Sequence, residues 1–170
     1  MSGNSTSSSP ISRTRIGVAS LVVSAAGLVG IASDEDFRAA AYQDIGGIWT
    51  IGYGETLGVK PGQATSPRAA LKRLEVRVEE HAQGVRACAK APLHQHEFDA
   101  YVSLAYNIGV HGFCSSSIPG LLAQGQYTAA CDHLMQFNKV RINGVLQPVR
   151  GLTVRRLKER SRCLGEGNHV

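Results

Sequence analysis

The sequence lacks several patterns that would indicate a function directly. Its four cysteines, Cys88, Cys114, Cys131 and Cys163, form no CxxC pair and show no zinc-ligand spacing with histidine, so we expect no metal site and no cofactor. Aromatic residues make up only 6% of the chain, and the basic residues alternate with glutamate, as in LKRLEVRVEE. Nucleic-acid binders usually combine clustered Lys and Arg with exposed aromatics, so we expect no nucleic-acid partner. No internal repeat is visible.

Charge is unevenly distributed along the 170 residues. The formal net charge is +5, but Arg13 and Arg15 belong to the start of the chain, and the body from Asp34 onward carries +3. This mild excess favours anionic partners such as a cell-wall polymer or a membrane surface. This length is sufficient for one domain with a hydrophobic core, or for a small domain with two lobes.

Residues 16–33 contain no charge at all, and we call them the leader segment. As one helix they would be about 27 Å long, close to the roughly 30 Å hydrocarbon core of a bilayer. Arg13 and Arg15 lie upstream, as the positive-inside rule requires for a chain exported beyond the cytoplasm. A cleaved signal peptide, a weak anchor and a buried helix all fit this pattern. Three glycines and three serines weaken membrane insertion, so we favour the weak anchor.

These features divide the chain into three parts. Residues 1–15, rich in Ser, Thr, Gly and Asn, are expected to form a disordered cytoplasmic start, residues 16–33 the anchor, and residues 34–170 the folded domain. Periodicity within the domain predicts a first helix over residues 34–43 and a strand over 48–53. Further helices are expected over residues 65–88, 98–107, 117–123, 127–137 and 153–164. The expected architecture is α+β, with a small β-containing lobe and a larger helical lobe around a cleft.

The even cysteine count predicts two disulfides in an exported protein. Three connectivities are available, and we favour Cys114 with Cys131 and Cys88 with Cys163. Four buried thiols are the alternative if the chain stays in the cytosol.

Two carboxylates and a threonine occur around the predicted strand. Glu35 is followed by Asp44 nine residues later and by Thr50 six residues after that. Glycosidic bond cleavage needs one carboxylic acid to protonate the leaving oxygen and a second, ionised carboxylate to act on the water or the sugar. Spacing alone is weak support, because a first-turn glutamate and a turn-forming aspartate would look the same.

The residues around this pair resemble the phage-type lysozymes, glycoside hydrolase family 24. EDFRAAAYQDIGGIWTIGYGET is similar to the family's active-site signature, E-G-x-R, then A-Y-x-D, then G-x-x-T-I-G-Y-G-H-T. FDAYVSLAYNIG and GLTVRRLKER resemble its later helices, so three motifs in the right order cover residues 34–164. The resemblance implies a mostly helical lysozyme-like fold and an inverting N-acetylmuramidase acting on peptidoglycan.

The resemblance also implies roles for single residues. Glu35 would be the general acid, Asp44 would position or deprotonate the water, and Thr50 would support that water. Tyr42 and Asn107 match cleft-lining positions, and Arg156 matches a basic residue near the acid, so the resemblance implies that all three bind substrate. A core aromatic, a helix-end cap and a solvated charge are their alternatives.

Two positions depart from the family pattern. The glycine after the glutamate is Asp36, which places another carboxylate beside the acid or simply points to solvent. The histidine before the last threonine is Glu55, for which we expect a changed local salt bridge rather than lost activity.

Some members of this family carry a signal-anchor-release (SAR) segment, and the leader segment is similar to one. That resemblance implies export by the host secretion machinery, tethering to the inner membrane of a Gram-negative host, and release into the periplasm as a monomer. A thiol switch is excluded, because no cysteine precedes Cys88 and position 44 is Asp. The rival hypotheses are a lytic transglycosylase that uses Glu35 alone and a tethered wall-binding protein without catalysis. No sequence motif supports a DNA-binding protein.

Overall fold

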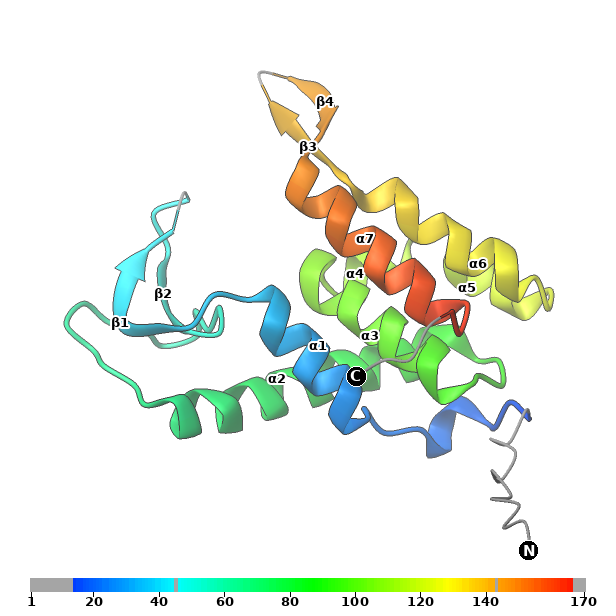
Figure 1. Cartoon of the computed structure of the whole chain (residues 1–170), viewed down its shortest axis with the longest axis horizontal. Coiled ribbons are helices and arrows are strands. Elements are labelled where there is room, and N and C mark those ends of the chain that lie inside the picture. Colours follow the sequence, from blue (N-terminus) through cyan, green and yellow to red (C-terminus); the bar gives the residue numbers. More distant parts are fainter. Residues whose placement is uncertain (1–13, 45, 143, 167–170) are drawn as a thin grey trace, which may run out of the picture.

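The computed structural model describes residues 14–44, 46–142 and 144–166 (Figure 1). The elements in chain order are η1 Val18–Ser20, α1 Ala25–Asp34, β1 Arg38–Gln43, β2 Trp49–Gly52, α2 Pro67–Ala89, α3 Gln95–Ile108, α4 Val110–Cys114, α5 Ile118–Ala123, α6 Tyr127–His133, η2 Leu134–Phe137, β3 Lys139–Ile142, β4 Val145–Pro148 and α7 Arg150–Cys163. The strands form two separate antiparallel pairs, β1–β2 and β3–β4. The predicted class, a mostly helical lysozyme-like α+β fold, is confirmed.

The β1–β2 hairpin forms the small lobe together with the turns that follow it. Its strands are antiparallel, with Tyr42 opposite Thr50 and an irregularity between Arg38 and Tyr42. The connecting turn contains Gly47 at φ +76°, a conformation that glycine adopts without a Cβ penalty. Figure 1 shows this hairpin at the left, outside the cluster of helices, with α2 running from its side into that cluster.

Helix α3 is the central element of the helical lobe. It packs against α2, α4, α7 and α1. Phe98, Tyr101 and Leu104 on this helix are fully buried, and each such side chain contributes roughly 1.5–3 kcal/mol by leaving water. A helix that is buried nearly all round belongs at the centre of a core, so α3 is the support against which the other elements are positioned.

The prediction of a helix over residues 34–43 is wrong. Helix α1 lies upstream of it, with Ser24 as N-cap accepting a hydrogen bond at 3.0 Å from the Gly27 amide. Residues Arg38–Gln43 form a strand instead. Alanine favours helix locally, but backbone pairing with β2 on one side and with residues 63–65 on the other overrides that preference. Glu35 is therefore at the C-cap of α1 and not in the first turn of a helix.

The leader segment is folded against the helical lobe as two short pieces, η1 and α1. Val18, Leu21 and Ile31 are buried in the main core. Between the two pieces the chain is extended at Leu21, whose carbonyl accepts a hydrogen bond from Arg86 Nη1 at 2.9 Å. Among the described residues, no helix is both long and apolar enough to span a bilayer. Of the expected disordered start, residues 1–13 lie outside the described residues.

Two disulfides are present, but the favoured pairing of their cysteines is wrong. Cys88 is bonded to Cys114 and Cys131 to Cys163, with Cα–Cα distances of 5.5 and 5.6 Å. The first joins α2 to α4 and the second joins α6 to α7. Each closes a loop of moderate length, a constraint typically worth about 2–4 kcal/mol. Both bonds therefore connect helices of the larger lobe and leave the β1–β2 hairpin unconstrained.

Candidate active site

Glu35 lies where α1, α7 and the turn after β2 meet. Its Oε1 accepts a hydrogen bond from Arg155 Nη1 at 2.9 Å, and its side chain is 24% exposed. The other carboxylate oxygen, Oε2, would lie 3.5 Å from a Cβ at Gly54, which has φ +81°. Glycine is favoured there by its backbone conformation, and position 54 therefore adds no side chain beside Oε2. One oxygen of Glu35 is thus held by a cation while the other faces a bare stretch of backbone.

Arg155 on α7 connects three carboxylates. Besides Glu35, its Nε lies 3.7 Å from Asp34 Oδ2 and 3.5 Å from Glu159 Oε1. Its side chain is only 10% exposed, so these charge pairs are weakly screened by solvent. The planar guanidinium suits such multiple recognition better than an ammonium. Arg155 therefore holds the end of α1, and Glu35 with it, against α7.

The prediction that Arg156 lines the cleft near the acid needs correction. Arg156 is 0% exposed and its Nε pairs with Glu159 Oε2 at 2.7 Å. Burial raises the pKa of Glu159, and the positive charge of Arg156 opposes that rise. The basic residue in contact with Glu35 is its neighbour, Arg155. The motif GLTVRR identifies the right turn of α7, but consecutive helical residues point about 100° apart and only structure tells which of the two faces the acid.

Asp44 and Thr50 lie on the same hairpin. Asp44 Oδ1 accepts hydrogen bonds from the amides of Gly46 and Ile48, at 2.8 and 2.9 Å. Thr50 on β2 is 4% exposed, and its hydroxyl donates to Ile48 O at 3.1 Å. Asp44 thus has one oxygen fixed by the turn, and its second oxygen accepts no hydrogen bond within the described part of the chain. The separation of the Glu35 and Asp44 carboxyl groups stays a prediction.

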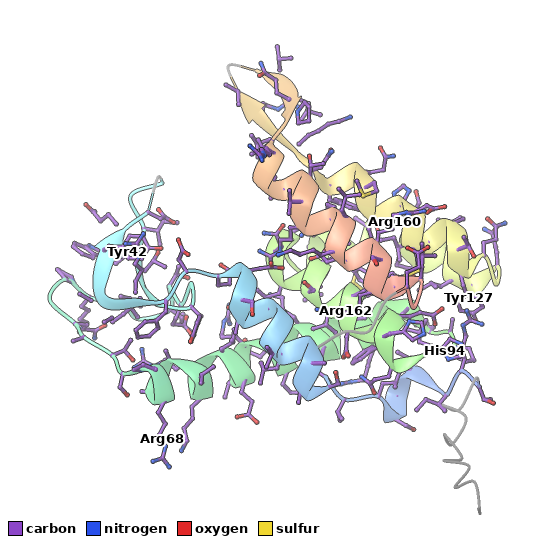
Figure 2. All side chains as sticks on the ribbon, viewed as in Figure 1. Tyr42, Arg68, His94, Tyr127, Arg160 and Arg162 are labelled. Atoms are coloured by element: carbon purple, nitrogen blue, oxygen red, sulfur yellow. A yellow bond between two sulfur atoms is a disulfide. The ribbon has the colours of Figure 1, made fainter. Side chains whose placement is uncertain are left out.

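The two remaining predicted substrate-binding residues belong to different lobes. Tyr42 on β1 is 39% exposed, with Arg38 Cζ 5.6 Å from its ring centroid. Figure 2 shows Tyr42 on the hairpin, far from the labelled arginines of α7. Asn107 is exposed near the end of α3. Both are accessible, as substrate contact requires, and no direct contact joins them among the described residues.

Tyr106 is a site residue that the sequence motifs did not single out. Its hydroxyl donates to Tyr53 O at 3.1 Å, so it links α3 to the turn after β2. Burial raises the pKa of Tyr106 to about 12, and the negative charges of Glu35 and Glu55 add to the effect. It stays a neutral hydrogen-bond donor at physiological pH and ties the two lobes together beside Glu35. Its place in the segment AYNIG, before Asn107, was the available signal.

The two departures from the family pattern have modest structural consequences. Glu55 Oε1 accepts a hydrogen bond from the Leu57 amide at 2.7 Å, and its backbone pairs with Ile51 in both directions. In the part of the chain that the structure describes, Glu55 makes no ion pair, so the expected salt bridge is not found. Asp36 is exposed to solvent.

Comparisons with known proteins show the family to which the chain belongs. The family model described as phage lysozyme matches residues 32–159. The endolysin of Acyrthosiphon pisum secondary endosymbiont phage 1 is 34% identical over 139 residues, or 82% of this chain and 95% of the relative. The SAR-endolysin of Escherichia phage P1 is 32% identical over 152 residues, or 82% of this chain and 80% of the relative.

Solved structures give the same result. The muramidase domain of SpmX from Asticaccaulis excentricus has a TM-score of 0.81 and 30% identity, covering 85% of this chain and 98% of that one. The active form of the P1 phage endolysin Lyz has a TM-score of 0.75 and 28% identity, covering 88% of each chain. Its secreted inactive form shares the fold at a TM-score of 0.57, covering 85% of this chain and 96% of that one. The chain belongs to the phage lysozyme family, and it is a glycosidase of the endolysin type.

Proposed function

We propose that the enzyme hydrolyses the β-1,4 bond between N-acetylmuramic acid and N-acetylglucosamine in peptidoglycan, with Glu35 as general acid. The observation that carries this proposal is the setting of its carboxyl group, with Oε1 bonded to Arg155 and Oε2 beside Gly54. A proton carried on Oε2 is presented beside Gly54, which adds no side chain between the acid and a sugar. An acid on the leaving oxygen is the first requirement of glycoside hydrolysis.

Asp44 and Thr50 supply the second requirement, an activated water. The turn amides hold Asp44 Oδ1 and so orient the carboxylate, and Oδ2 takes the proton of the water. The Thr50 hydroxyl donates to Ile48 O, which leaves its oxygen to accept a hydrogen bond from the same water. Attack from the face opposite the leaving group inverts the anomeric carbon, and such enzymes separate their carboxyl groups by about 6.5–9.5 Å.

Product analysis tests this proposal. Purified full-length protein is incubated with peptidoglycan, and the released muropeptides are analysed by mass spectrometry before and after borohydride reduction. Hydrolysis predicts reducing N-acetylmuramic acid ends, and it predicts that Asp44→Asn loses activity along with Glu35→Gln. Products lighter by one water and resistant to borohydride, with Asp44→Asn still active, would instead identify a lytic transglycosylase. No released products would favour a wall-binding protein without catalysis.

We propose further that the leader segment tethers the exported chain to the host inner membrane in an inactive state. The name SAR-endolysin for the P1 relative supports this proposal, and so does the absence of charge from residues 16–33. Helix α1 contains the second half of the leader segment, and Glu35 is its C-cap. A leader segment held in the bilayer therefore cannot also occupy its place against α3. Export uses the host secretion machinery, and the released monomer acts on peptidoglycan in the periplasm.

The described conformation corresponds to the released state under this proposal. Its likeness to the active form of P1 Lyz, at a TM-score of 0.75, exceeds that to the secreted inactive form, at 0.57. All four cysteines are in disulfides between elements of the helical lobe. Control of activity therefore depends on where the leader segment lies and needs no thiol exchange.

A further inference from the structure

Asp99 on α3 is a buried carboxylate to which the reaction described above assigns no role. It is 4% exposed and accepts hydrogen bonds from the Ser24 amide at 3.0 Å, from the Ser24 hydroxyl, and from Gln95 Nε2 at 2.9 Å. Gln95 Nε2 also donates to Val22 O at 2.8 Å. Two of the three groups that donate to Asp99 thus belong to one residue of the leader segment, Ser24, which directly precedes α1.

These contacts place a negative charge at the start of α1. Ser24 is the N-cap of this helix and accepts from the Gly27 amide at 3.0 Å. The first amides of a helix carry a partial positive charge, which a carboxylate stabilises. Asp99 thereby fixes Ser24 in the rotamer that caps the helix, and binds α1 to the most deeply buried helix of the protein.

Gly27 makes this close approach possible. A Cβ at Gly27 would lie 2.7 Å from Asp99 Cγ and 2.8 Å from Oδ1, closer than non-bonded atoms approach. Gly30, one turn further along α1, is covered in the same way by the guanidinium of Arg162, which comes from α7 and is labelled in Figure 2. Two of the three glycines that weaken the leader segment as a membrane anchor are therefore also the residues that admit charged groups of the folded body.

Helix α1 is held at both ends, with Glu35 at its far end. Asp99 binds the N-cap, Ser24, and Arg155 pairs with the last helical residue, Asp34, and with the C-cap, Glu35. A helix of ten residues is a stiff rod of about 15 Å, so a shift at its start is transmitted to its end. We infer that Asp99 is a positioning residue, which sets the location of the Glu35 carboxyl group by binding the N-cap of α1. This inference depends on Glu35 being the general acid.

The test compares kcat and KM of purified full-length variants on soluble peptidoglycan fragments, at a temperature where circular dichroism shows each to be folded. Asp99→Ala is expected to lower kcat by about tenfold or more, because small misplacements of catalytic groups are costly, and to change KM less than about twofold. Asp99→Asn keeps an acceptor oxygen for Ser24 and is expected to recover most of kcat.

Glycine substitutions provide a matched pair. Gly27→Ala, which collides with Asp99, is expected to lower kcat to a similar degree, whereas Gly17→Ala meets nothing within 4 Å and is expected to be neutral. In an Asp99→Ala background, Gly27→Ala should cost little more, because the colliding carboxylate is gone.

Two results would overturn the inference. One is an Asp99→Ala variant with reduced thermal stability but native kcat. The other is equal behaviour of Gly27→Ala and Gly17→Ala. Glu35→Gln, assayed alongside, separates this inference from the proposed function: if it is inactive while Asp99→Ala keeps native kcat, the positioning role alone is wrong, and if it is active, the assignment of Glu35 is wrong.

Discussion

Replacing Glu35 with Gln is expected to reduce muralytic activity at least about 100-fold while leaving the fold intact. The amide has no proton to give to a leaving oxygen, and a positioned general acid typically contributes 10²–10⁴-fold. Gln keeps the size of Glu and an oxygen that accepts the Arg155 hydrogen bond now made at 2.9 Å. The loss should therefore appear in kcat and not in the melting temperature. Turbidity loss of a peptidoglycan suspension, together with circular dichroism, measures both.

Asp36→Asn is the matched control for this substitution. It removes one negative charge from the neighbouring position, where the side chain is exposed. Its activity is expected to stay within about twofold of the native enzyme, because an exposed charge is strongly screened. A Glu35→Gln enzyme with more than about a tenth of native activity would contradict the assigned role.

Replacing Glu159 with Ala is expected to destabilise the protein by about 3–5 kcal/mol, the usual effect of leaving a buried charge without its partner. Glu159 is 2% exposed and accepts a hydrogen bond from Ser103 at 2.7 Å. Its other oxygen pairs at 2.7 Å with Arg156, which is fully buried. The substitution strands the Arg156 guanidinium in the core. It also removes one of the carboxylates around Arg155, which lies 3.5 Å away.

Chemical denaturation of three variants tests this expectation. Asp132→Ala breaks the exposed pair with Arg160, whose side chains are 49% and 35% exposed, and should cost less than about 1 kcal/mol. Arg156→Met combined with Glu159→Leu removes both buried charges and should recover much of the loss, since no charge is left unpaired. Equal stability of Glu159→Ala and Asp132→Ala would show that the buried pair contributes no more to the free energy of unfolding than the exposed pair.

The helices of the larger lobe were predictable because local and long-range preferences agree there. Helix α2 begins with Ser66 accepting from the Ala69 amide at 3.3 Å and with Pro67 in its first turn. The apolar residues Ala70, Leu74 and Val78, spaced for one helical face, are all buried. The expected and observed bounds of this helix accordingly differ by two residues or fewer.

Around Glu35 the local and long-range preferences conflict, and the sequence alone predicts the wrong secondary structure. The segment RAAAYQ reads as helix by composition, yet it forms β1 because β2 offers it backbone partners. The helix lies instead in the leader segment, whose lack of charge suits a bilayer and a protein core equally well. The available signal for the start of this helix was Ser24, because serine is a favoured N-cap residue.

Contacts between distant segments account for the remaining errors. The disulfide pairing depends on how α2, α4, α6 and α7 pack, and four cysteines allow three pairings. Arg155 and Arg156 are adjacent in the sequence, and the choice between them depends on the orientation of α7. The strand expected over residues 48–53 is present as β2, which contains Thr50, because strand formation there follows from the local pattern.

We propose that the segment that tethers the enzyme also forms the helix that positions the Glu35 carboxyl group. Fractionation of producing cells combined with zymography, before and after the membrane potential is dissipated, tests it most directly. We expect full-length protein without activity in the membrane fraction beforehand, and full-length, active protein in the soluble fraction afterward. A membrane-bound form as active as the released one, or an active soluble form shortened by loss of residues 16–33, would contradict it.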